Sequence, residues 1–189
     1  MKKNKIQPGT YLFPLPVVII GAKVGDKANF MTVAWCSVVE NKPPILLIST
    51  SKKHHTNKGI RKNQTFSINI PSEELVEVTD FIGIRSGKDL DKSDLFDVFY
   101  GELETAPMIQ EAAVNMECKV IKTIELEEEH EIFIGQVIQA YSDKKYLTNG
   151  ILDIGKIKPL IYATGQKSYW NVGEEIGKAW NIGREYVKK

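Results

Sequence analysis

Cysteine and histidine are scarce in this sequence of 189 residues. The two cysteines, Cys36 and Cys118, lie far apart and form no Cys-x-x-Cys pair, so we expect reduced thiols in a cytoplasmic protein. Of the three histidines, His54 and His55 are adjacent, so their side chains diverge, and His130 stands in an acidic stretch. No set of residues has the spacing of metal ligands, and the sequence therefore predicts no metal site.

Several motifs of enzymes are missing as well. The chain has no Gly-x-Ser-x-Gly elbow to expose a nucleophilic serine and no Gly-x-x-x-x-Gly-Lys phosphate loop. It also lacks Gly-x-Gly-x-x-Gly, so a nicotinamide cofactor would bind without a Rossmann turn. We therefore assign no catalytic residue.

Charge of one sign is not in excess, because 25 Lys and Arg balance 24 Asp and Glu. This balance argues against nucleic acid or an anionic membrane as a partner, and any anion site must be local. The apolar run over residues 17–22 is far too short for a membrane span or a signal-peptide core. The length is typical of a single domain, which we expect to cover residues 1–189.

The sequence contains many short runs that are rich in β-branched residues. They predict strands over residues 16–21, 31–39, 45–50, 66–70, 116–126, 132–140 and 160–163. Helices are expected over residues 53–63, from Ser72 to Ile84, and in the tail around Ile176 and Trp180. The hairpin-rich order predicts a mainly β fold, an antiparallel β-barrel with helical insertions.

Small and hydroxyl-bearing residues cluster over residues 29–37, where a strand leaves a turn. Such a segment exposes backbone N–H and C=O groups at close range, which suits a flat heteroaromatic ligand with acceptor edges. The alternative is a barrel strand whose small residues allow close packing.

A second polar cluster covers residues 49–56 and reads Ser-Thr-Ser-Lys-Lys-His-His-Thr. Hydroxyls, a cation and the free N–H groups of a helix start are the composition of a monophosphate site. The alternative is a solvated turn from strand to helix in which Thr56 only caps the helix.

Seven segments in order resemble one known family. They are residues 16–20, 29–35, 43–44, 49–56, 66–69, 86–92 and 117–120. The chain resembles the flavin reductase-like, FMN-binding split-barrel family, particularly its flavoredoxin-like branch. The resemblance implies a Greek-key antiparallel split barrel and a homodimer that binds FMN near the subunit interface. Clustered aromatic residues also favour a homodimer, namely Tyr162, Tyr169, Trp170 and Trp180.

The same resemblance implies two groups of FMN-binding residues, and it assigns no role to residues 86–92. The isoalloxazine and ribityl chain would contact Asn29, Met31, Thr32, Val33 and Ala34. The phosphate would contact Ser49, Thr50, Ser51, Lys53, His55 and Thr56.

The resemblance favours an NAD(P)H-dependent flavin oxidoreductase in which the cofactor carries out the chemistry. Two alternatives stay open at this point. One is a non-enzymatic electron carrier reduced by a protein donor, and the other is a flavin-storage dimer without turnover.

Overall fold

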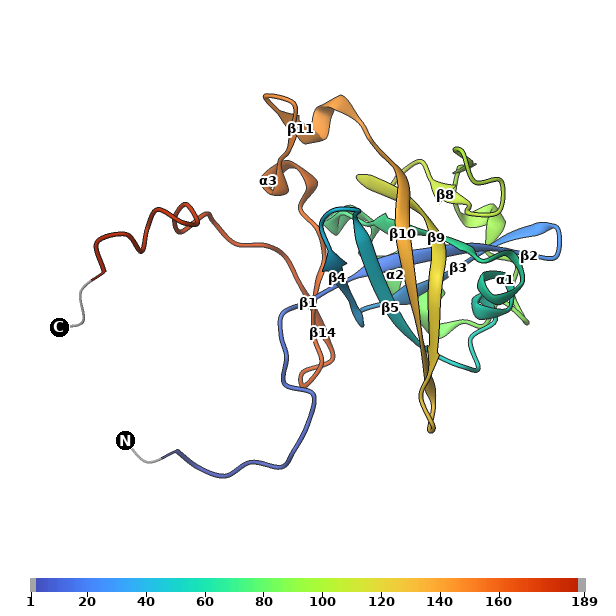
Figure 1. The fold of residues 1–189 in the computed structure, drawn as a ribbon, viewed down its shortest axis with the longest axis horizontal. Coiled ribbons are helices and arrows are strands. Elements are labelled where there is room, and N and C mark those ends of the chain that lie inside the picture. The colour runs from blue at the N-terminus through green and yellow to red at the C-terminus, as the bar shows by residue number, and fades with distance from the viewer. Residues whose placement is uncertain (1–2, 187–189) are drawn as a thin grey trace.

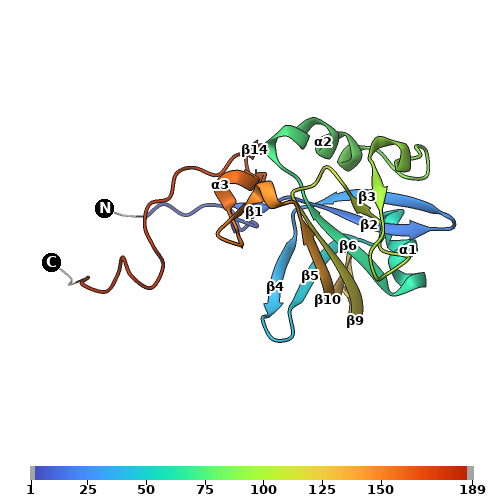
Figure 2. The same ribbon diagram turned by 90° about the horizontal axis from the view of Figure 1, so that it is seen from above.

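A curled antiparallel sheet forms the centre of the protein, for which a computed structural model describes residues 3–186 (Figure 1). Its strand order is β3 (Lys27–Val33), β2 (Val18–Val24), β6 (Thr65–Ile70), β9 (Val114–Glu125), β10 (His130–Ser142), β5 (Ile45–Ser51) and β4 (Cys36–Glu40). In Figure 2, β2 and β3 run across the view while β5, β9 and β10 fan away from them. This arrangement confirms the expected mainly β, antiparallel fold.

The two edge strands of this sheet are consecutive in the chain. β3 ends at Val33 and β4 begins at Cys36, so residues 34 and 35 alone connect opposite edges. Three peptide steps span at most about 11 Å, which forces the edges together and curls the sheet toward a barrel. The backbone N–H of Ser49 donates to the carbonyl of Trp35 over 2.8 Å. The single strand expected over residues 31–39 is therefore wrong, because the chain changes edges inside it.

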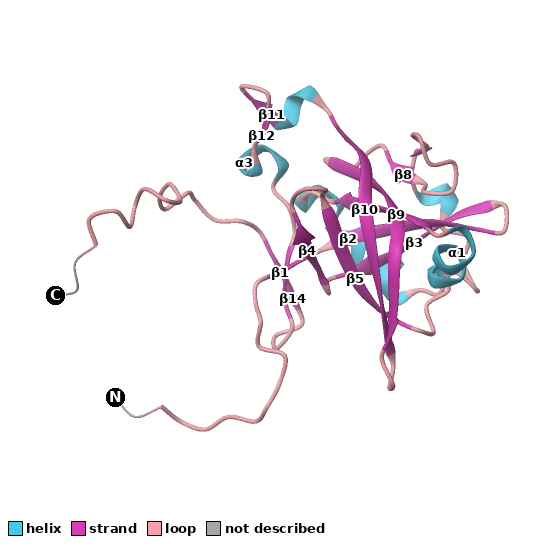
Figure 3. Cartoon of the chain, viewed as in Figure 1, coloured by secondary structure: helices cyan, strands magenta, loops and turns pink. Residues whose placement is uncertain are grey.

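Smaller elements surround the large sheet (Figure 3). The strands are β1 (Leu15–Pro16), β13 (Ile161–Ala163) and β14 (Ser168–Trp170) in one sheet, the pair β7 (Val98–Phe99) and β8 (Met108–Ile109), and the pair β11 (Leu147–Thr148) and β12 (Ile151–Leu152). The helices are α1 (Thr56–Asn63), α2 (Val76–Ile84) and α3 (Ile154–Ile157), with 3-10 turns at Glu73–Leu75, Ser93–Leu95 and Lys144–Tyr146. No helix among residues 3–186 is long and apolar enough to cross a membrane.

The main core lies between the layers of the curled sheet. Ile20, Ile48, Phe66 and Phe133 are fully buried there, each from a different strand. Ile60 of α1 joins this cluster, as the apolar position in the predicted helix requires. Burial of these side chains fixes α1 against the sheet, and it thereby fixes the loop that precedes the helix.

The expected tail helix is also wrong. Residues 171–178 have no regular structure and residues 179–185 form consecutive turns, and Ile176 and Trp180 are exposed. Three glycines in this segment, Gly173, Gly177 and Gly183, disfavour a helix by about 1 kcal/mol each relative to alanine.

Candidate functional site

Three adjoining cavities form a groove beside β3. The middle one, which we call the cationic cavity, has a volume of about 270 Å³. It lies between β3, the β5–α1 loop, the end of α2 and the loop over residues 85–92. Its walls include Met31, Thr32, Lys53, His54, His55, Thr56, Gly83, Arg85, Gly87 and Lys92.

The other two cavities adjoin the cationic cavity through different residues and share none with each other. The loop cavity, about 270 Å³, shares His55 and Gly87 with the cationic cavity and reaches Asn29 and Lys88. The tyrosine cavity, about 320 Å³, shares Thr32, Gly83 and Ile84 with the cationic cavity. It also contains Ala34, Asp80, Tyr162, Lys167 and Tyr169. The groove therefore has a cationic centre and an aromatic end.

Lys92 is a buried cation at the wall of the cationic cavity, with 2% of its surface exposed. Its Nζ donates to the carbonyl of Phe30 over 2.9 Å and to that of Ile82 over 2.7 Å. An ammonium has three donors, so one remains for a ligand. Within residues 3–186, no carboxylate lies at ion-pairing distance from Lys92. Burial lowers the pKa of Lys92 to about 8, which leaves it charged at neutral pH.

Thr56 and His55 add further polar groups to the same cavity. Asn29 Nδ2 donates to Thr56 Oγ1 over 2.7 Å, which leaves the hydroxyl proton of Thr56 for another acceptor. α1 begins at Thr56 with His55 at the N-cap and no side-chain capping bond, so Thr56 is not the cap. Nδ1 of His55 is buried and has no partner within residues 3–186. Burial and then Lys58, Lys88 and Lys92 lower the pKa of His55, in keeping with a cationic site.

The tyrosine cavity carries two aromatic rings on its wall. The ring centroids of Tyr162 and Tyr169 lie 5.9 Å apart, and the Tyr169 hydroxyl donates to Asp80 Oδ1 over 2.9 Å. Burial and this hydrogen bond raise the pKa of Tyr169, so its hydroxyl stays protonated. This end of the groove suits a planar aromatic group.

Comparison with known proteins decides the family. The model of the flavin reductase like domain matches residues 10–171. The chain belongs to this family. A flavoredoxin from Methanosarcina acetivorans is 43% identical with a TM-score of 0.94, over 97% of this chain and 98% of that one. The flavoredoxin of Desulfovibrio vulgaris (Miyazaki F) is 32% identical with a TM-score of 0.89, over 97% and 100% of the two chains.

A third relative is a reductase component from Rhodococcus opacus, that of 4-nitrophenol 4-monooxygenase/4-nitrocatechol 2-monooxygenase. It is 26% identical to this chain, over 74% of this chain and 77% of its own length. Together these likenesses support a flavin-binding protein.

The residues predicted to bind FMN divide into two sets. The groove contains Asn29, Met31, Thr32, Ala34, Lys53, His55 and Thr56. The others do not line it: Val33 lies in the core, and Ser49, Thr50 and Ser51 lie along β5. Thr50 is 1% exposed, and its hydroxyl accepts from Asn57 Nδ2 over 2.9 Å.

An ion pair between the exposed Arg61 and the buried Glu131 holds the loop that enters α1. Arg61 binds both carboxylate oxygens of Glu131, with Nε donating to Oε2 over 3.0 Å and Nη2 donating to Oε1. Asn57 Nδ2 donates to Glu131 Oε1 over 2.6 Å and to the carbonyl of Ser51 over 2.9 Å. β10, the end of β5 and α1 are thus tied together directly behind Lys53 and Thr56.

Sequence reasoning missed Lys92, Tyr162 and Tyr169 as parts of the groove. Lys92 is the last residue of the segment 86–92, which resembles the family. That resemblance was the signal in the sequence that could have identified Lys92 as a site residue. The two tyrosines were expected in the interface or core, since nothing local in the sequence places β13 and β14 beside α2.

Proposed function

We propose that the groove binds FMN, with the phosphate in the cationic cavity and the isoalloxazine toward the tyrosine cavity. The observation that carries this proposal is Lys92, a buried cation with a free donor and, among residues 3–186, no carboxylate partner. A buried charge is costly unless it is compensated, and an anionic ligand supplies the missing compensation.

The polar groups of the cationic cavity fit a phosphate. Lys92, Lys53 and the Thr56 hydroxyl can each donate, and the buried Nδ1 of His55 lacks a partner in the described part of the chain. The N-terminus of α1 adds the positive end of the helix dipole. Riboflavin lacks the phosphate and would lose these contacts, so FMN is the preferred flavin.

The proposed activity is that of an NAD(P)H-dependent flavin oxidoreductase, in line with the reductase component among the relatives. Bound FMN would supply the redox chemistry, with electrons passing onward to an acceptor. The chain's own residues bind the phosphate, orient the ring between β3 and the tyrosines, and restrict water at the buried side. No side chain is needed as an acid or base, which agrees with the absence of a catalytic motif in the sequence.

An electron carrier reduced by a protein donor is the second candidate, and the likeness to two flavoredoxins favours it. Anaerobic titration separates the two candidates. Bleaching of the flavin absorbance by stoichiometric NADH or NADPH supports the oxidoreductase. If the flavin is bleached by a reduced ferredoxin-type protein but not by either nucleotide, the carrier is correct.

We also propose that the protein is a homodimer. An apolar cavity of about 480 Å³ adjoins β4, with walls that include Leu12, Val38, Leu46 and Met116. Val38 is 70% exposed and Leu12 is 80% exposed. Monomeric proteins rarely leave such a continuous apolar surface in water, and a second copy is the partner that the family resemblance favours.

Replacing Thr56 with valine should weaken FMN binding about tenfold, because one hydrogen bond to a charged group is lost. Riboflavin binding should stay nearly unchanged. Flavin fluorescence quenching measures both dissociation constants. Thr65→Val is the matched control, since that buried hydroxyl bonds Thr105 over 2.6 Å and lies outside the groove. Equal losses for FMN and riboflavin would move the phosphate away from α1.

A further inference from the structure

Two arms leave the body of the protein on the same side (Figures 1 and 2). The N-terminal arm comprises residues 3–14 and the C-terminal arm residues 171–186. The C-terminal arm presents its largest apolar side chains to solvent, with Ile176 93% exposed and Trp180 94% exposed. Exposed aromatic residues of this size are typical of segments that bind another surface.

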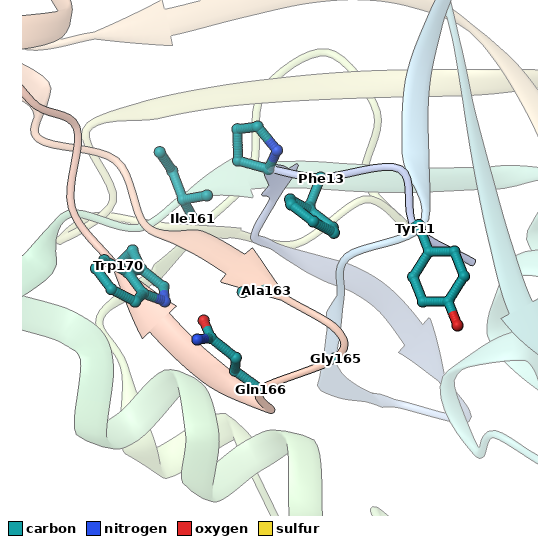
Figure 4. Close-up of a pocket in the computed structure, with 8 residues that line it drawn as sticks. Tyr11, Phe13, Ile161, Ala163, Gly165, Gln166 and Trp170 are labelled. Atoms are coloured by element: carbon teal, nitrogen blue, oxygen red, sulfur yellow. The ribbon is translucent and has the colours of Figure 1, made fainter. Parts of the chain in front are cut away.

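An apolar pocket lies at the base of both arms. Its volume is about 590 Å³, which is within the range of pockets that hold organic ligands, ~300–1,000 Å³. Phe13, Ile161, Gln166 and Trp170 lie around it, between the N-terminal arm and the β13–β14 hairpin (Figure 4). No charged side chain lines it within residues 3–186, so an indole ring suits it.

The β13–β14 hairpin separates this pocket from the flavin groove. Tyr162 pairs with Tyr169, and both line the tyrosine cavity. Ile161 pairs with Trp170, and both line the apolar pocket. Successive residues of a strand point to opposite faces. The β13–β14 hairpin therefore forms a wall of the tyrosine cavity with one face and a wall of the apolar pocket with the other.

We propose that the C-terminal arm of a second copy of this chain inserts Trp180 into the apolar pocket. The inserted ring packs against the back of the hairpin whose front carries Tyr162 and Tyr169. Each copy thereby stabilises the aromatic end of its partner's flavin groove. This last step rests on the proposed FMN site, whereas the docking of the arm does not.

A second copy is favoured over the chain's own arm for two reasons. The arm leaves β14 and runs away from the body of the protein, and Trp180 is 94% exposed, so its ring does not fill the chain's own pocket. Both arms also project to one side, where a twofold partner would receive the C-terminal arm between its own N-terminal arm and hairpin. The exchange is reciprocal, as a closed twofold assembly requires.

Cross-linking between two chains of different length tests the docking. One chain carries Trp180→Cys and the other carries Ala163→Cys, both in a Cys36→Ser background because Cys36 is the less buried native thiol. A short bismaleimide should give a product with the summed mass of the two chains. Ile151→Cys, on the exposed β12, replaces Trp180→Cys as the control and should give none. The proposal is wrong if no mixed product forms. It is also wrong if a chain that carries both Trp180→Cys and Ala163→Cys forms a cross-link only within itself.

The coupling to the groove has a separate test. Trp180→Ser should raise the dimer dissociation constant roughly 30-fold, the effect of losing an interface hot spot. It should also weaken FMN binding about tenfold, a usual size of coupling between sites. Ile151→Ser is the matched control and should change neither. If wild-type protein binds no flavin, the FMN proposal fails while the cross-link still decides the docking. Unchanged dimerisation in Trp180→Ser overturns the docking.

Discussion

Replacing Arg61 with methionine should lower the free energy of unfolding by about 3 kcal/mol. The variant leaves the carboxylate of Glu131 buried without its cation, and breaking a buried pair in this way costs about 3–5 kcal/mol. The lower end of that range applies because the Arg61 side chain is 43% exposed and because Asn57 still donates to Glu131 Oε1. Urea unfolding followed by circular dichroism measures the loss.

Two further variants identify the cause of that loss. Arg61→Met combined with Glu131→Leu should recover much of the stability, because no buried charge is then left unpaired. Arg85→Met is the control, since Arg85 is exposed and its loss should change stability by less than about 0.5 kcal/mol. A double variant as unstable as Arg61→Met alone would show that the ion pair is not the origin of the effect.

Replacing Lys92 with methionine should weaken FMN binding about a hundredfold. A charge-assisted hydrogen bond to phosphate contributes about 1.5–3 kcal/mol, and the upper value applies at a buried site. Riboflavin, which has no phosphate, should bind the variant nearly as it binds wild type. An equal loss for both flavins would place the phosphate elsewhere in the groove.

The same variant should remove a pH dependence of FMN binding. The pKa of Lys92 in the free protein is lowered to about 8 by burial, and a bound phosphate would raise it again. Wild-type affinity for FMN should therefore be full below pH 8 and fall as the pH rises above that value. The ratio of FMN to riboflavin affinity, measured between about pH 7.5 and 10, should fall in wild type and stay flat in Lys92→Met. A flat wild-type ratio would exclude Lys92 as the phosphate ligand.

The sequence predicted most of the large sheet because its signals are local. Alternation over residues 66–70 and β-branched composition over residues 45–50 are properties of single strands, and both strands were confirmed. The break between Val33 and Cys36 was not predictable in this way. It depends on where β4 pairs, and apolar residues continue through it.

The groove was predicted less completely for a similar reason. Residues 53–55 precede α1 and Thr56 begins it, and a helix start is visible in the sequence. Whether Thr50 faces a ligand or the interior depends on Asn57 and Glu131, which lie on other elements. Lys92 looks like an ordinary surface lysine until the fold buries it against Phe30 and Ile82.

The two-residue connection between β3 and β4 joins the flavin groove to the apolar surface proposed for dimerisation. Ala34 lines the tyrosine cavity, and Val38 lines the apolar cavity beside β4. Because only two residues connect β3 and β4, a shift of one strand displaces the other. Thermodynamic linkage then makes the effect reciprocal: by whatever factor self-association changes flavin affinity, flavin changes self-association by the same factor. The protein concentration is therefore part of any flavin dissociation constant measured for this chain.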